Sequence, residues 1–305
     1  MPTYAPTVPS LDGSKLTVDY LMKSPLIVQR LVRSIAEQRL IGGHILTGRV
    51  DMTGSGAAVY EVDDPIMVDD DPEAVDELAE YKLVDDADGD PQLAEAINRG
   101  FASRISDKNV SRNRLDVVAR KLRRMANRAV FHFDSLVMSA VGSSVTQTQA
   151  AAAAWSTTGA DQFLDLLLSG ATIDEQNEGY VANTVVARPE KWARLVASIA
   201  KTFAGAVGTP DIIGKGNVLE VAGLTLLKST NLPTSTDVMV LDNTALGSIG
   251  FERLGGGYLG EVSDPLGIET KQFRLEDRDG WQVQVRKSGV PMVQEPRAAV
   301  KVTGV

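Results

Sequence analysis

Residues 115–140 read LDVVARKLRRMANRAVFHFDSLVMSA and decide the fold class. Apolar residues recur along this stretch in steps of three and four, the pattern of a helix with one buried face. The apolar stripe consists of Leu115, Val118, Leu122, Met125, Ala129, Phe133, Leu136 and Ala140. A helix over residues 113–140 would be about 42 Å long at ~1.5 Å per residue. We expect so long a helix to brace an extended sheet or to cross the whole molecule.

The residues before this helix are predicted to form an arm and a short helix that cannot fold alone. Three prolines among the first nine residues fix the backbone and remove hydrogen-bond donors, so about the first 20 residues are expected to be extended. Ser24 is then a helix N-cap, and Pro25 occupies the first helical position. Gly42 and Gly43 are expected to end this helix.

Residues 44–62 carry the pattern of a β-hairpin. β-branched and aromatic residues lie on both sides of a connection whose glycines permit positive φ angles. The connection consists of Thr53, Gly54, Ser55 and Gly56. Beyond it a short helix is expected from Asp71 to Glu80, because its acidic first turn suits the positive end of the helix dipole.

Residues 155–305 are predicted to interleave helices with short strands. Helices are expected over residues 161–169 and 189–203. The expected strands are bounded by glycine-containing loops and turns, and they cover residues 184–186, 221–227, 238–241, 268–275, 281–286 and 298–302. Because no βαβ unit repeats, the sequence indicates an α+β fold.

The composition leaves few residues for catalysis. The absence of cysteine excludes disulfides, thiol nucleophiles and zinc sites built on thiolates. His132 is expected to be a hydrogen-bonded core residue. The acidic turn around Gly89 lacks the first carboxylate of a calcium loop, so we prefer a solvated turn to a weak calcium site. We predict no catalytic, cofactor-binding or metal-binding residue, and no cofactor.

Charge is segregated along the chain. The net charge of −9 argues against a protein whose main task is to bind nucleic acid phosphates. Residues 61–95 nevertheless contain fifteen acidic residues and one basic residue, whereas residues 99–128 contain ten basic and two acidic residues. These blocks could pair within one chain or between neighbouring copies with complementary potentials. The alternative is that they are two separately solvated faces.

Targeting signals are not recognised in the sequence. The first residues lack the basic and apolar regions of a signal peptide. No run of about 18 apolar residues could span a membrane. The chain is therefore expected to stay in the cytosol or to go wherever an assembly takes it.

The order of these parts resembles the major capsid protein of tailed double-stranded-DNA bacteriophages. Residues 105–142 are similar to the spine-helix region of that family, and residues 182–196 are similar to its strand followed by a proline-started helix. Residues 218–249 resemble its glycine-preceded strand, proline turn and aspartate-led segment, and residues 286–304 resemble its closing strand. The resemblance covers most of residues 20–305 in order.

This resemblance implies a subunit of four parts and no enzyme. The parts are an N-terminal arm (residues 1–41), an extended loop or E-loop (42–98), a peripheral domain with the spine helix (99–154 and 262–305) and an axial domain (155–261). The implied function is that of a viral structural protein. Its copies would self-assemble into hexamers and pentamers of an icosahedral capsid that encloses the phage double-stranded DNA.

The implied partners are other copies of the chain, a separate scaffolding protein and a portal, with decoration proteins as a further candidate. Packaged DNA would be contacted only weakly, and no membrane would take part. The capsid would be assembled in the host cytoplasm and located in the virion. The candidate inter-subunit contact residues are Thr53, Gly54, Ser55, Gly56, Asp69, Asp70, Asp71, Arg112, Arg120 and Arg124.

Two other functions remain open from the sequence. An encapsulin nanocompartment shell shares the implied architecture and would enclose an enzyme cargo instead of DNA. A soluble hydrolase that uses carboxylates from residues 61–95 belongs to a different class. The size of the native particle separates a shell protein from such an enzyme.

Overall fold

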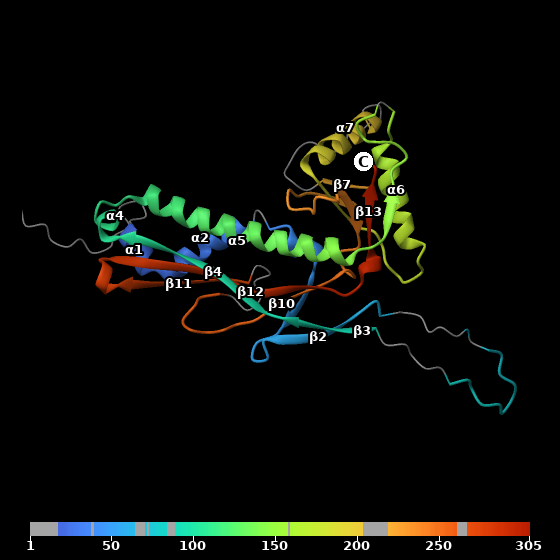
Figure 1. The fold of residues 1–305 in the computed structure, drawn as a ribbon, viewed down its shortest axis with the longest axis horizontal. Helices are drawn as coiled ribbons and strands as arrows, with labels where there is room; N and C mark the ends of the chain where they lie inside the picture. Colours follow the sequence, from blue (N-terminus) through green and yellow to red (C-terminus); the bar gives the residue numbers. More distant parts are fainter. Residues whose placement is uncertain are drawn as a thin grey trace, which may run out of the picture.

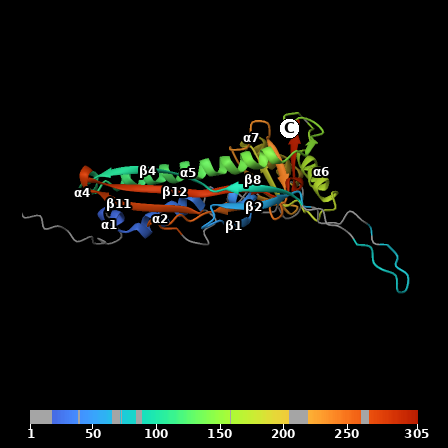
Figure 2. The same ribbon diagram turned by 60° about the horizontal axis from the view of Figure 1, so that its bottom comes forward.

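A computed structural model describes residues 18–37, 40–64, 71, 73–83, 89–157, 159–203, 219–260 and 267–305. The molecule is elongated (Figure 1). A long sheet and helix α5 (Leu115–Ser144) extend through one part, and a six-stranded sheet with two helices lies at the other end. In Figure 2 the strands of the long sheet lie side by side, and the long helix runs along them. The mixture of helices and sheets confirms the α+β fold class.

The expected long helix is confirmed as α5 (Leu115–Ser144), which has 30 residues and continues four residues beyond the predicted end. Its buried side includes Val118, Leu122, Val137 and Val141, all at most 1% exposed. This side packs against strand β12 (Gly280–Val293) and helix α2 (Pro25–Glu37). The helix therefore braces the long sheet through its apolar stripe, as its length led us to expect.

The long sheet has five strands in the order β1-β10-β12-β11, with β4 paired to β12 as well. The strands are β1 (Gly48–Asp51), β4 (Ile97–Ser106), β10 (Gly247–Phe251), β11 (Ile268–Leu275) and β12 (Gly280–Val293). The β11–β12 hairpin confirms the prediction for that region, and a short 3-10 helix, η1 (Glu276–Arg278), connects its strands. β4 was not predicted, although all ten of its residues pair with β12.

The arm contains more helix than expected. Helices α1 (Val18–Lys23) and α2 (Pro25–Glu37) flank Ser24, so residues 18–20 are helical and not extended. The backbone N–H of Val18 donates to the Asn113 side chain at 2.9 Å, which caps α1, and the apolar side of α1 is buried in the core that also contains α5. The first 17 residues lie outside the described part of the chain.

Gly42 and Gly43 do not end α2, because they open the short helix α3 (Gly42–Ile45). α2 ends at Glu37 in the described residues. A side chain at Gly42 would meet Val137 and Asp134 at about 3 Å, so glycine lets α3 approach α5 closely. The prediction was wrong because Gly42 serves this contact and both glycines lie within α3.

The expected hairpin over residues 44–62 is also wrong. β1 pairs in parallel with β10, whereas β2 (Ala57–Val62) pairs with β3 (Asp90–Glu95) in a separate two-stranded ribbon. Gly48 permits the parallel pairing, because a Cβ there would stand 2.6 Å from the Ser248 Cβ. Gly54 and Gly56 have positive φ angles and turn the chain out of the long sheet.

The expected helix from Asp71 to Glu80 is absent from its described residues, where only residues 77 and 78 form a turn. Leu78 and the residues around it are exposed, so a helix there would have no apolar surface to pack against. The favourable acidic first turn is too small an effect to stabilise an isolated helix of this length.

The six-stranded sheet has the order β5-β13-β9-β6-β8-β7. Its strands are β5 (Thr148–Ala150), β6 (Thr184–Ala187), β7 (Leu219–Val221), β8 (Leu224–Lys228), β9 (Val238–Leu241) and β13 (Ala299–Thr303). The single strand expected over residues 221–227 is two strands, because Ala222 and Gly223 form a turn with positive φ angles. A 3-10 helix, η2 (Pro296–Ala298), precedes β13.

Helices α6 (Gln162–Asp174) and α7 (Pro189–Phe203) confirm both helix predictions and cover one face of this sheet. Val185 and Val240 point to these helices, whereas Val186 and Met239 join the core that contains α5. The sheet is therefore buried on both faces, which explains its nearly continuous apolar strands. No described helix is both long and apolar enough to cross a membrane.

Candidate functional site

The β2–β3 ribbon presents an exposed apolar face. Val59 and Leu93 lie directly opposite each other in the ladder and are 71% and 64% exposed. The other face of the ribbon packs Ala58 and Ala94 against Met52. The outward face therefore has apolar side chains that no described part of the same chain covers.

The loop that connects β2 to β3 is described at Asp71 and over residues 73–83, where it is fully exposed. Figures 1 and 2 show residues 73–83 away from both sheets. Its large apolar side chains are Val75, Leu78, Tyr81 and Leu83. Within this segment Lys82 lies 3.7 Å from Glu73. The loop thus combines exposed apolar residues with a high density of carboxylates.

A basic surface follows the solvent side of α5 and the residues just before it, where Arg112 and Arg114 lie. The predicted contact residues Arg112, Arg120 and Arg124 are exposed, and Arg120 and Arg124 are one helical turn apart. Other exposed arginines on the same stretch are Arg114, Arg123 and Arg128. None of these six forms an ion pair with a described residue. We refer to the six as the α5 arginines.

The acidic and basic blocks do not meet within the described part of one chain. Asp63 lies 3.6 Å from Arg297, and Asp107 lies 2.9 Å from Arg274, so both contacts join one block to residues outside the other. Of the predicted acidic contact residues, Asp71 is exposed, whereas Asp69 and Asp70 lie outside the described residues. Intramolecular pairing of the two blocks is therefore not observed among the residues that the structure describes.

The turn of Thr53, Gly54, Ser55 and Gly56 lies beside the end of β10, and its first three residues are exposed. The Arg253 N–H donates to Thr53 Oγ1 at 3.1 Å. The Ser55 hydroxyl donates to the Ala57 carbonyl at 2.8 Å. The predicted contact residues thus form three separate groups on one subunit: this turn, the acidic loop and the arginines.

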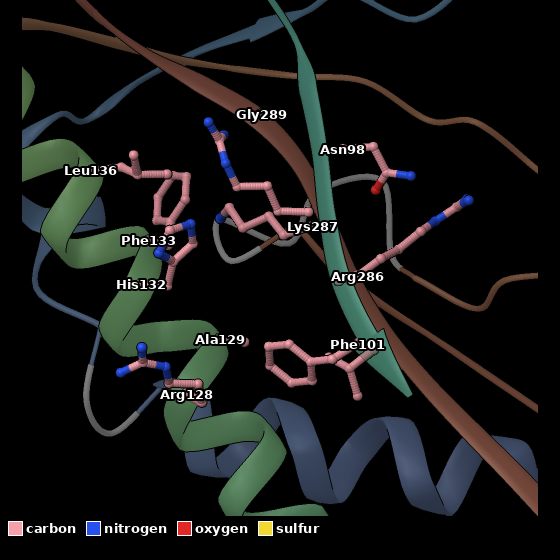
Figure 3. A pocket seen from close by; sticks show the side chains of 13 residues that line it. Asn98, Phe101, Arg128, Ala129, His132, Phe133, Leu136, Arg286, Lys287 and Gly289 are labelled. Atoms are coloured by element: carbon pink, nitrogen blue, oxygen red, sulfur yellow. The ribbon is translucent and has the colours of Figure 1, made fainter. Parts of the chain in front are cut away.

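A cavity of about 420 Å³ lies between α5, β4 and β12. Figure 3 shows Phe101 from β4 and Ala129 and Phe133 from α5 around this space. The Lys287 ammonium stands 3.5 Å from the centre of the Phe133 ring. His132 is exposed at the cavity, so its prediction as a core residue was wrong. No sequence pattern indicated the cavity, because one wall is the unpredicted strand β4.

Asp134 is a buried carboxylate that joins α5 to the start of α3. It accepts hydrogen bonds from the backbone N–H groups of Gly42 at 2.8 Å and Ile41 at 3.2 Å. Burial raises the pKa of Asp134 to about 6, although the two N–H groups and nearby Lys287 act in the opposite direction. The helical periodicity placed Asp134 near the end of α5 but did not indicate its long-range partners.

A second polar contact links the connection between α6 and β6 to the segment that follows β12. The Tyr180 hydroxyl donates to Glu295 at 2.7 Å. Burial raises the pKa of both side chains, and nearby Asp63 adds to the shift of each. Arg297 is the cation at this corner, 3.9 Å from Glu178. Among the described residues, no group of three or more histidine or carboxylate side chains is arranged to hold a metal ion.

Comparison with solved structures shows that the chain has the fold of capsid and encapsulin shells. It resembles the capsid of the cyanophage P-SCSP1u with a TM-score of 0.58 and 15% identity, over 87% of this chain and 88% of that one. It resembles the virus-like particle of Pyrococcus furiosus with a TM-score of 0.54 and 11% identity, over 90% and 96% of the two chains. It resembles the SrpI encapsulin complex of Synechococcus elongatus with a TM-score of 0.52 and 12% identity, over 85% of each chain.

Comparison of the sequence with protein-family models identifies the family of the chain. A family model described as phage capsid protein matches residues 90–302, and the chain belongs to this family. No curated protein sequence matches the chain. The resemblance to bacteriophage major capsid proteins is confirmed, and the protein is a capsid shell protein, a structural protein of the virion. Copies of the chain therefore assemble with one another.

Proposed function

We propose that the chain forms hexamers and pentamers that build an icosahedral shell around phage double-stranded DNA. The observation that carries this proposal is the exposed apolar surface of the β2–β3 ribbon and its loop, which includes Val59, Leu93, Leu78 and Tyr81. Uncovered apolar surface of this kind is costly in a monomer and is typical of interaction sites. Contact with neighbouring copies would cover it.

The four-part division predicted from the sequence belongs to this proposal. Residues 1–41 would be the arm, 42–98 the extended loop, 99–154 with 262–305 the peripheral domain, and 155–261 the axial domain. Four strands cross these ranges, since β1 and β10 lie in the long sheet, and β5 and β13 lie in the six-stranded sheet. The peripheral and axial domains would therefore exchange strands, and β1 would join the extended loop to the long sheet.

We also assign the candidate contact residues to interfaces between copies. The acidic loop, including Asp69, Asp70 and Asp71, would lie on the α5 arginines of a neighbour, including Arg120 and Arg124. Support comes from the complementary charge of the two surfaces and from the lack of ion pairs for these arginines within the described chain. The turn from Thr53 to Gly56 would make a separate contact at the edge of the long sheet.

The proposal includes further partners and a place of assembly. A scaffolding protein, a portal and decoration proteins would bind the shell, which would form in the host cytoplasm. Packaged DNA would touch the shell only weakly, because the chain has a net charge of −9. The encapsulin-like shell is the second candidate, supported by the similarity to the SrpI complex. Nucleic acid or protein cargo in particles from infected cells would distinguish the two.

The first test is particle size. The full chain, expressed alone and with a candidate scaffolding protein, is expected to elute from a size-exclusion column at megadalton mass and to form closed shells visible by negative-stain microscopy. A shell of many copies follows from the proposed hexamers and pentamers. Elution only as a small oligomer under both conditions would contradict the proposal.

A second prediction concerns the charged contact. The double substitution Arg120→Glu and Arg124→Glu is expected to lower particle yield at least tenfold and to leave the subunit folded, because both side chains are exposed without ion-pair partners in the described chain. Changing Asp69, Asp70 and Asp71 to lysine in the same chain is expected to restore yield. Lys201→Glu, on the exposed side of α7, is the matched control. Equal yields for all variants would contradict the contact.

A third prediction concerns covalent linkage. Residues 44–81 contain no lysine, so no isopeptide bond is expected from the first part of the extended loop. Mature particles boiled in detergent are expected to give monomers of 32.6 kDa on a denaturing gel. A ladder of covalent multimers would contradict this expectation.

A further inference from the structure

Helix α6 is apolar on the side that faces solvent as well as on the side that faces the core. Leu166 and Ile173 lie on the inner side of α6 and are fully buried. Leu164, Leu167 and Leu168 are 47%, 41% and 47% exposed, and their spacing places them on one outer face. A helix that is apolar all round is normally buried. We call these three residues the α6 leucine face.

The α6 leucine face has no charged residue within it. Between its two ends the helix has a single ionisable side chain, Asp165, and this carboxylate is turned inward. It accepts hydrogen bonds from the Trp155 indole at 2.9 Å and from the backbone of Ala152 at 3.1 Å. The exposed charged side chains of α6 lie at its two ends, at Asp161, Asp174 and Glu175. The outer face is thus an apolar centre with an acidic rim, the anatomy of a protein interface.

The neighbouring helix α7 shows that the fold does not require such a face. α7 covers the same sheet and buries Leu195 and Ile199. Its outer side has the usual charges, including Glu190 and Arg194, which pair at 3.1 Å. Two helices in equivalent positions therefore differ in their solvent side, and the composition of α6 requires a cause outside the described subunit.

We infer that the α6 leucine face is covered by a second copy of this chain in the assembled shell, an inference that rests on the proposed function. α6 lies at the end of the molecule opposite α4 (Asp107–Ser111) in both views (Figures 1 and 2). Copies arranged around a common axis at that end would bring α6 against the next copy. In a closed ring two different surfaces meet. Packaged DNA is not the occupant, because phosphates bind cationic groups.

A labelling experiment tests the inference without disturbing the fold. Because the chain has no cysteine, Leu168→Cys introduces a single thiol on the α6 leucine face. Its reaction with a maleimide is expected to be at least tenfold slower in assembled particles than in unassembled subunits. Ala193→Cys, on the exposed side of α7, is the matched control and is expected to change less than threefold. Equal rates at position 168 in particles and subunits, or equal protection at position 193, would overturn the inference.

Charged substitutions give an independent readout. Leu167→Asp with Leu168→Asp is expected to lower particle yield at least tenfold while the melting temperature of the unassembled subunit stays within a few degrees. Ala193→Asp is expected to leave the yield unchanged.

The two experiments distinguish a failure of the inferred α6 interface from a failure of the proposed function. Protection of the Leu168→Cys thiol already in the unassembled subunit would show cover within one chain and would overturn the inference. If the unsubstituted chain forms no particles, the proposed function fails as well. Normal particles in which the thiol at position 168 stays reactive refute the interface alone.

Discussion

Glu269→Leu is expected to lower the free energy of unfolding of the subunit by about 3–5 kcal/mol, the usual cost of breaking a buried ion pair. Glu269 and Arg286 are cross-strand neighbours in the β11–β12 hairpin, and their side chains are 14% and 11% exposed. The two groups approach to 2.6 Å. Removing the carboxylate leaves the guanidinium enclosed in the sheet without its counter-charge.

Arg286 cannot relieve this loss by turning to solvent, because two further contacts hold it. Its guanidinium donates to the Gly255 carbonyl at 2.8 Å and stacks 3.6 Å from the centre of the Tyr258 ring. Urea unfolding of dilute, unassembled subunits, followed by circular dichroism, measures the effect. The double variant Glu269→Leu with Arg286→Met is expected to lose less than the single variant, since neither charge remains. A single-variant loss below ~1 kcal/mol would contradict a buried pair.

The second large effect concerns Asp134. Asp134→Asn is expected to stabilise the subunit by up to about 3 kcal/mol at pH 7.5, because the amide keeps an acceptor for Gly42 without a buried charge. The pKa of Asp134 is raised from 3.8 to about 6 on folding, so the folded state binds the proton more tightly. The stability contributed by protonation is complete below pH 3.8 and is lost as pH rises through about 6.

The measurement is the difference in unfolding free energy between Asp134→Asn and the unsubstituted chain as a function of pH. This difference is expected to be large at pH 7.5 and to shrink toward pH 4, and taking the difference cancels the titration of other carboxylates. Asp134→Ala is the control, since it also removes the acceptor of the Ile41 and Gly42 N–H groups and is expected to cost about 1–3 kcal/mol relative to asparagine. A difference that is constant from pH 4.5 to 7.5 would contradict the assignment.

Local periodicity accounts for the parts of the fold that the sequence predicted. The apolar stripe of α5, the proline-started helix α7 and the β11–β12 hairpin each have their signal within one continuous segment. Pairings between distant segments were not predicted. β1 meets β10 although the two strands are far apart in the sequence, and β4 meets β12 with most of its side chains exposed, so neither strand shows a clear alternation.

The same difference between local signals and contacts of distant segments holds for the candidate surfaces. Exposure of Arg112, Arg120 and Arg124 could be predicted, because charged residues opposite an apolar stripe face solvent. The cavity at Phe101 and His132 could not be predicted, since it exists only where β4 lies beside α5. The α6 leucine face could have been predicted, because the run from Leu164 to Leu168 is too apolar for a helix with one solvent-exposed side.

The connections between the two sheets determine which parts of the subunit can adapt. The chain passes between them after α5, after β9 and after β12, each time through only three to five residues. One continuous apolar core spans the junction, from Val137 of α5 to Met239 of β9. Three short connections around a shared core hold the two sheets together. Where the curvature of the shell changes from place to place, we expect the β2–β3 ribbon to adjust more than the two sheets, because it shares no strand with either of them.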